Sequence, residues 1–197
     1  MKPLPTDALN QLFLDARTLF AWKPEGLSDE VIHQLYALTK QGPTATNSHP
    51  TRFFFVKSAA AKERLKPALS PGNVEKTMTA PLTVVIAVDE KFHEQMPTLF
   101  PHRPELKDSL GAMPDDKRQF LLTQNSGLEA GYFIMAARSL GLDAGPMGGF
   151  DRARVDATVL EGTGWKSVLL INVGYGDRST LKPRLPRLDF DVACRIA

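Results

Sequence analysis

The stretch Leu82-Thr83-Val84-Val85-Ile86-Ala87-Val88 is an almost unbroken apolar run. Its β-branched residues favour a strand, and a run with little polar alternation is typical of a strand covered on both faces. Two other runs have similar character, Arg52-Phe53-Phe54-Phe55-Val56-Lys57 and Lys166-Ser167-Val168-Leu169-Leu170-Ile171-Asn172-Val173. We therefore expect three strands to form the centre of one sheet.

Helical segments separate these strands. Ser28 is a suitable N-cap for a helix that Gly42-Pro43 would stop, and residues 116–140 predict one long helix. The inner side of the long helix is expected to include Leu122, Leu128 and Tyr132. Helices and strands thus alternate irregularly, which predicts a single α+β domain over residues 1–197, with a mixed or antiparallel sheet flanked by helices.

Three segments lack a regular pattern. Residues 90–116 contain four prolines and predict an irregular binding loop or lid. Residues 143–151 are rich in turn residues and predict a loop after the long helix. Because three strands are few for this length, we expect a fourth from the tail after Gly174, which could pair with another subunit.

Composition and charge narrow the class of protein. The chain has 197 residues, a formal net charge of +2 and no long basic run, so charge gives no case for nucleic acid or membrane partners. Cys194 is the only cysteine, which excludes an internal disulfide and any Cys/His metal spacing. With no signal-peptide pattern and no long apolar span, the sequence predicts a cytoplasmic protein.

Common nucleotide motifs are absent. No GxGxxG follows a strand, and there is neither a Walker A segment nor a GxSxG elbow. A classical Rossmann domain is therefore not expected, and any redox cofactor would need a different kind of binding site.

Four segments in order resemble the nitroreductase family. Pro43-Thr44-Ala45-Thr46-Asn47-Ser48-His49-Pro50 is similar to that family's Pro-Ser-Ser-x-Asn-x-Gln-Pro segment. Asn73-Val74-Glu75-Lys76 resembles its Asn-x-x-Lys turn, and Pro146-Met147-Gly148-Gly149-Phe150-Asp151 its Pro-x-x-Gly-Phe-Asp loop. Lys182-Pro183-Arg184-Leu185-Pro186 is similar to its basic C-terminal segment. Ala16-Arg17-Thr18 and Ile171-Asn172-Val173-Gly174-Tyr175-Gly176-Asp177 look like the HadB/RutE branch, which includes malonic semialdehyde reductases.

The resemblance implies an FMN fold built as an intertwined homodimer, with flavin sites between subunits and NAD(P)H as cosubstrate. Cations suit the FMN phosphate, and a cation near flavin N1 stabilises the reduced ring. No catalytic acid or base is implied, because the protein supplies mainly position, electrostatics and exclusion of water. The implied contacts are Arg17, Thr18, Lys182 and Arg184 for phosphate, Asn73 and Lys76 for the ribityl chain and N1 edge, Pro43, Thr44 and Asn47 from the partner, Gly148 and Gly149 by backbone at N5, and Asn125 at the ring edge.

The chain departs from the family pattern at three places. The family usually has a second basic residue three positions after the Ser/Thr of its N-terminal motif, but Leu19-Phe20-Ala21-Trp22 contains no cation. Lys76 would then carry the N1 charge alone. Ala16 stands where many members have Arg, which leaves the register of Arg17 open, and Gly148 replaces the usual acidic residue of the loop.

The predicted activity is reduction of malonic semialdehyde to 3-hydroxypropionate, in pyrimidine degradation. Two rivals stay open, a broad nitroarene or quinone reductase and a flavin-binding module without turnover. Each segment also has a plainer interpretation. Gly42–Pro50 could be a helix stop and a polar loop, Lys182 and Arg184 a solvated tail, and Asn125 a structural residue.

Overall fold

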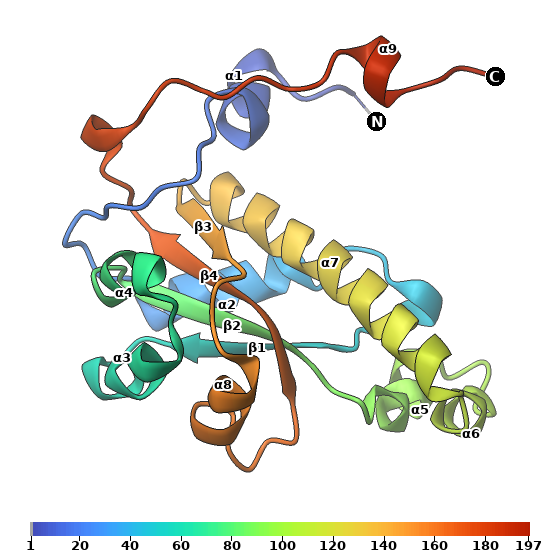
Figure 1. Ribbon diagram of the computed structural model, residues 1–197. Coiled ribbons are helices and arrows are strands. Elements are labelled where there is room, and N and C mark those ends of the chain that lie inside the picture. Colours follow the sequence, from blue (N-terminus) through green and yellow to red (C-terminus); the bar gives the residue numbers. More distant parts are fainter. Residues whose placement is uncertain (1) are drawn as a thin grey trace.

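The computed structural model describes residues 2–197 and is built around one four-stranded sheet (Figure 1). Its strands are β1 (Thr51–Val56), β2 (Leu82–Val88), β3 (Asp143–Met147) and β4 (Lys166–Gly174), in the order β1-β2-β4-β3. All neighbours are antiparallel. The three strands expected from apolar runs are confirmed, and the sheet is antiparallel rather than mixed.

The fourth strand corrects the sequence prediction. Residues 143–147, expected to be loop, form β3 and pair with β4 from Asp143↔Gly174 to Met147↔Leu170. Pro146 is tolerated because β3 lies at the edge of the sheet, where a missing N–H costs no ladder bond. The tail after residue 180 forms no strand in the described chain, so the expectation of a strand from the tail within this subunit is wrong.

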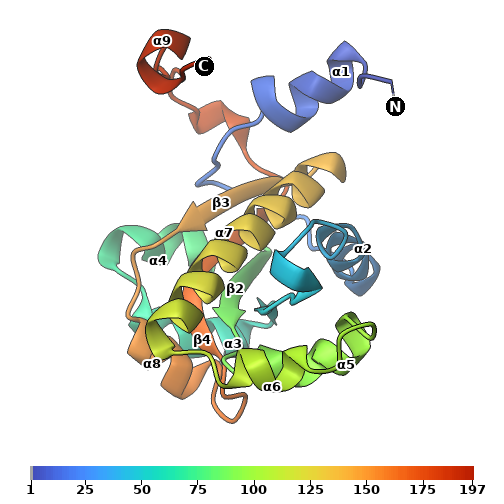
Figure 2. The ribbon, with the colours of Figure 1, turned by 90° about the vertical axis from the view of Figure 1, so that its right-hand side faces the viewer.

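Helices cover both faces of the sheet (Figure 2). On one face α2 (Asp29–Thr39) and α7 (Asp115–Ser139) pack over Val84 and Ile86. The other face holds α3 (Ala59–Leu65), α4 (Pro71–Met78) and α8 (Arg152–Thr158), and its core includes Val85 and Ala87. The apolar β2 run is therefore buried on both sides, as expected.

The long helix has the predicted extent but a different inner face. Leu128 is 45% exposed, whereas Phe133 and Ala137 are fully buried. The buried stripe also contains Asn125 and Glu129. Because this buried stripe contains polar residues, apolar periodicity alone does not identify it. This is why the prediction that Leu128 lies on the inner side is wrong.

The segment before α7 is more ordered than its prolines suggested. It forms η4 (Phe92–Gln95), α5 (Met96–Leu99) and α6 (Leu106–Gly111). Phe92, Met96 and Leu110 join a small hydrophobic cluster of their own. The expectation of an irregular stretch is therefore wrong.

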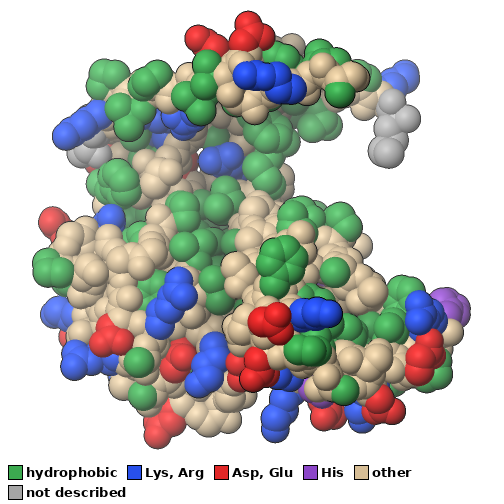
Figure 3. Space-filling model, turned by 45° about the vertical axis from the view of Figure 1, so that its right-hand side comes forward, with side chains coloured by type: hydrophobic (Ala, Val, Ile, Leu, Met, Phe, Trp, Pro, Cys, Tyr) green, Lys and Arg blue, Asp and Glu red, His purple; other side chains and the backbone are tan. Residues whose placement is uncertain are grey.

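Both terminal segments project from the layered body at one end (Figures 1 and 3). The first consists of α1 (Thr6–Leu9) and the π-helical turn η1 (Asn10–Leu14), and the last carries α9 (Phe190–Ala193). The short turns η2 (Ala45–Asn47), η3 (Lys66–Ala68) and η5 (Arg178–Thr180) complete the helices. Over residues 2–197, no helix combines the length and apolarity that crossing a bilayer requires.

Candidate functional site

A basic pocket forms where the N-terminal segment meets the tail. The tail residue Lys182 accepts a 2.7 Å hydrogen bond at its carbonyl from the guanidinium of Arg17. Arg184 donates in turn to the carbonyl of Ala16, at 2.9 Å. These contacts bring Arg17, Thr18, Lys182 and Arg184 to the wall of one pocket of about 660 Å³. Four residues from the two ends of the sequence thus line one pocket.

Arg138 is a fifth member of this pocket, which the sequence analysis missed. It lies in the last turn of α7, lines the pocket and donates to the carbonyl of Leu12 at 2.9 Å. Burial, and then the nearby charge of Arg184, lower the pKa of Arg138. The described lining has five cations, counting Arg187, and no acid. Such a donor set fits a multiply charged anion such as a phosphate.

The next group joins α4 to the turn after β3. Asn73 donates from Nδ2 to the carbonyl of Gly149 at 2.7 Å. A Cβ added at Gly149 would lie 2.7 Å from that nitrogen, so a side chain there would displace Asn73. A Cβ at Gly148 would meet nothing within 4 Å, which leaves the space beside this turn open.

Lys76 lies beside residues 19–22, the stretch that contains no cation. Its Nζ lies 4.7 Å from the centroid of the Phe20 ring, within cation–π range. Phe20 lines both the basic pocket and a second pocket of about 420 Å³ that Lys76 and Gly72 also line. The two pockets therefore adjoin at Phe20, and α4 brings a cation to the N-terminal stretch.

The C-terminal end of α4 is held by side chains from three other elements. The carbonyl of Lys76 accepts from Trp22 Nε1 at 2.9 Å and from Asn172 Nδ2 at 3.0 Å. Buried Lys62 donates from Nζ to the carbonyls of Thr77, at 2.8 Å, and of Ala80. Desolvation lowers the pKa of Lys62 to about 8. These bonds fix the end of the helix that positions Lys76.

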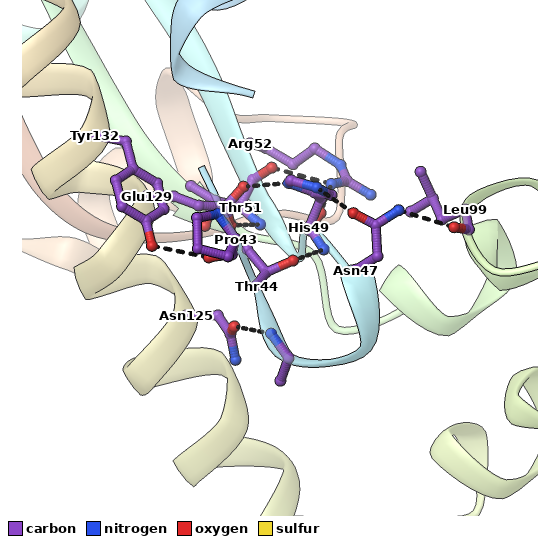
Figure 4. A network of polar contacts seen from close by, with 11 residues as sticks. Pro43, Thr44, Asn47, His49, Thr51, Arg52, Leu99, Asn125, Glu129 and Tyr132 are labelled. Atoms are coloured by element: carbon purple, nitrogen blue, oxygen red, sulfur yellow. Dashed lines mark hydrogen bonds and ion pairs between the residues drawn. The ribbon is translucent and has the colours of Figure 1, made fainter. Parts of the chain in front are cut away.

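The segment expected to contact the ring edge forms a loop over residues 43–50 against α7 (Figure 4). Asn125 is 1% exposed and accepts the N–H of Ala45 at 2.8 Å, while its own amide donates to Leu121. Tyr132 donates to the carbonyl of Pro43 at 2.9 Å. Asn125 thus spends its polar atoms on the loop and the helix, in line with a structural role.

The predicted site residues form two separate groups in one chain. The pockets at Phe20 collect the phosphate cations and Lys76, with Asn73 and Gly149 at the far end of α4. No residue of the loop 43–50 lines either pocket. One chain therefore does not bring Pro43, Thr44 or Asn47 to the pockets formed by the other candidates.

Comparisons with known proteins show the family and the fold. Residues 15–175 match the sequence pattern of the Nitroreductase family. A protein of Stutzerimonas stutzeri named "Putative NADH dehydrogenase/NAD(P)H nitroreductase" is 51% identical over 195 residues, which are 99% of this chain and 98% of that protein. A Burkholderia lata protein with the same kind of name is 52% identical over 196 residues, a coverage of 100% for each chain. The fold is similar to that of an Exiguobacterium sibiricum protein, a "putative nitroreductase in complex with FMN", with a TM-score of 0.86 and 18% identity over 100% of both chains.

Proposed function

The chain belongs to the nitroreductase family, and we propose that it is an oxidoreductase that passes hydride from NAD(P)H, through bound FMN, to a small electrophile. One observation carries this proposal. A pocket with five cations and no acid adjoins a second pocket in which Lys76 is held over Phe20. FMN matches this pair of pockets, because it has a phosphate at one end and, at the other, a ring that gains negative charge on reduction.

The residues present fit FMN. Arg17, Arg138, Lys182 and Arg184 would hold the phosphate, with the Thr18 hydroxyl at the same wall. Bound there, FMN would supply hydride transfer at N5 between NAD(P)H and the oxidised substrate. Further along the site, the Lys76 ammonium would stabilise negative charge at the N1 edge.

At the other edge, the Gly148–Gly149 backbone would face N5, and Asn73 keeps that turn in place. These residues orient the reactants and exclude water rather than transfer protons.

A second copy of the chain would complete each site. The loop 43–50 lies outside the pockets of its own chain, so Pro43, Thr44 and Asn47 would serve the flavin of a partner. The tail supports this dimer because apolar residues alternate at positions 188, 190, 192 and 196, and such a period favours a strand. In the single chain Phe190 and Val192 belong to the four-residue helix α9, which pairing with a partner would have to replace. The alternating residues whose side chains stand largely in solvent are Leu188 at 72%, Phe190 at 58%, Val192 at 67% and Ile196 at 87% exposed.

The outer edge of β1 is a suitable place for the partner's tail. β1 has a neighbour on one side only within the described chain, and a groove of about 530 Å³ runs beside it. Lys40 lines this groove, where Asp189 and Asp191 of an incoming tail would find opposite charge, whereas Arg52 in the same lining already pairs with Asp89. We propose that each tail adds a strand to the partner's sheet.

Malonic semialdehyde is the proposed substrate, and the product would be 3-hydroxypropionate, formed in the cytoplasm during pyrimidine degradation. Support comes from the segments similar to the HadB/RutE branch and from Gly148, which leaves out the acid that would repel a carboxylate. The names of the two similar proteins instead favour a nitroreductase with broad acceptors. Both activities would use the same pocket.

Acceptor kinetics would decide between these substrates. With NADPH or NADH fixed, kcat/KM is measured for malonic semialdehyde, for a neutral aldehyde of the same length, for a quinone and for a nitroarene. The proposal expects the semialdehyde to exceed the neutral aldehyde by about tenfold or more, the effect of one charge-assisted contact. Equal values for both aldehydes, with a faster quinone or nitroarene, would reject the substrate in favour of the broad reductase.

A further inference from the structure

The loop 43–50 has an unusual backbone that requires a restraint. Thr46, Asn47 and His49 all have positive φ, at 51°, 55° and 38°, although none is glycine. Such conformations persist only where surrounding contacts hold them. His49 is central to those contacts, because its N–H donates to Thr44 Oγ1 at 3.2 Å and its carbonyl accepts from Arg52 at 2.9 Å.

Both ring nitrogens of His49 face acceptors (Figure 4). Nδ1 lies 3.0 Å from Glu129 Oε1, and Nε2 lies 2.9 Å from Asn47 Oδ1. The orientation of the Asn47 amide is fixed, because its Nδ2 donates to the carbonyl of Leu99 at 2.8 Å. The Asn47 oxygen therefore needs a proton on Nε2.

The Glu129 carboxyl accepts a second bond and is deeply buried. Its Oε2 accepts the N–H of Thr51 at 3.3 Å, and its side chain is 3% exposed. Among the described residues, His49 is the only side chain that can carry a positive charge within ion-pair distance of it. Burying an ionised carboxyl without a charged partner is costly, so this geometry favours a second ring proton on Nδ1.

We propose that His49 is a positioning residue, held as an imidazolium between Glu129 and Asn47, and that this pair keeps the loop 43–50 in the shape that contacts a flavin. The proposed role of the loop in binding flavin rests on the proposed function. The His49–Glu129 ion pair is independent of it. Other charges near the ring are those of Arg52, which pairs with Asp89 at 2.8 Å, and of Lys40, which lines the same groove. The ring of His49 itself contacts only Glu129 and Asn47 among polar side chains of the described chain.

The charge state is tested by nitrogen NMR of the FMN-loaded, full-length protein labelled in its four histidines. Loss of one signal in His49→Gln assigns the ring. We expect both nitrogens of His49 to carry protons at neutral pH. A ring with one protonated nitrogen would overturn the proposal, whether or not the protein binds flavin.

The positioning role is tested with a matched pair of variants. His49→Gln keeps a hydrogen-bond donor toward Glu129 but removes the charge, whereas His49→Leu removes both, so the loop 43–50 should be loosened less in His49→Gln than in His49→Leu. Hydrogen exchange of residues 43–50 should be faster in His49→Leu than in His49→Gln or the natural protein, and the Kd of His49→Leu for FMN should rise about tenfold, the effect of losing a charged hydrogen bond. Unchanged exchange in His49→Leu overturns the restraint, and faster exchange with unchanged FMN affinity overturns only the link to flavin. Should His49→Leu not fold, Glu129→Gln bears the same test, because it removes the counter-charge and one of the two acceptors.

Discussion

The ammonium of Lys76 lies 4.7 Å from the centroid of the Phe20 ring. Phe20 belongs to the four-residue stretch Leu19–Trp22, which contains no cation, and α4 brings a positive charge to it from a different part of the chain. The carbonyl of Lys76 is held by Trp22, from the same stretch. The Lys76 ammonium therefore lies against the N-terminal segment, although Lys76 itself belongs to α4.

Removing this charge should disfavour the reduced flavin. We expect Lys76→Met to lower the two-electron potential of bound FMN by about 20–40 mV, which equals about 1–2 kcal/mol of lost charge stabilisation. Lys76→Arg keeps a cation on Phe20 and serves as the control. The potential is measured by anaerobic titration against a reference dye, and equal potentials for Lys76→Met and the natural protein would contradict the assignment.

Arg184 should be needed for retention of FMN. Because charged hydrogen bonds to phosphate contribute about 1.5–3 kcal/mol, Arg184→Ala should raise the Kd for FMN by about tenfold or more. Arg103, which pairs with Glu105 at 2.8 Å and does not line the basic pocket, gives the control Arg103→Ala. Affinity is measured by quenching of flavin fluorescence.

Arg184 also donates to the backbone of the N-terminal segment, so stability needs a separate check. Arg184→Lys keeps the charge and should retain more affinity than Arg184→Ala, at similar Tm. Full affinity in Arg184→Ala would rule out its phosphate role.

Buried Lys62 predicts a pH-dependent stability. Burial lowers its pKa from 10.5 to about 8 in the folded chain, so between these values the unfolded chain binds more protons. Its contribution to the free energy of unfolding should therefore rise with pH across that window, by at most about 1.4 kcal/mol per pH unit.

The reference for this effect is Lys62→Met, which cannot titrate. The difference in unfolding free energy between the natural protein and the variant, from urea titrations at pH 7, 8, 9 and 10, should increase above pH 8. A constant difference would mean that Lys62 keeps an ordinary pKa.

The tail should hold the dimer together. Deleting residues 188–197 removes the exposed alternating side chains, and we expect a monomer by size-exclusion chromatography with light scattering. Since each flavin site is proposed to use two chains, the shortened protein should also lose FMN. Cys194→Ser in the full chain is the control and should remain dimeric, and a truncated chain that stays dimeric would refute this role of the tail.

The sequence predicted the elements whose own residues decide their structure. Leu82–Val88 is buried on both faces because every residue in it suits that place. Residues 143–147 contain Gly145 and Pro146, which favour turns, and only the pairing with β4 makes them a strand. That pairing is a long-range effect that local propensity does not contain.

The linear sequence indicated only part of the candidate site. Linear segments indicated Arg17, Lys182 and Arg184, and the structure brings them together. Arg138 enters the pocket only because the end of α7 packs beside the N-terminal segment. His49 looked like a plain loop residue, since its partner Glu129 is 80 residues away in the chain.

Anaerobic spectroscopy of the FMN-loaded protein is the most direct test of the proposed activity. NADPH or NADH is added first, and a small electrophile, malonic semialdehyde or a quinone, is added after the nicotinamide is exhausted. The account predicts that the visible flavin absorbance bleaches in the first step and returns in the second. A protein that cannot be loaded with FMN, or one whose bound flavin stays oxidised with both nicotinamides, would contradict it.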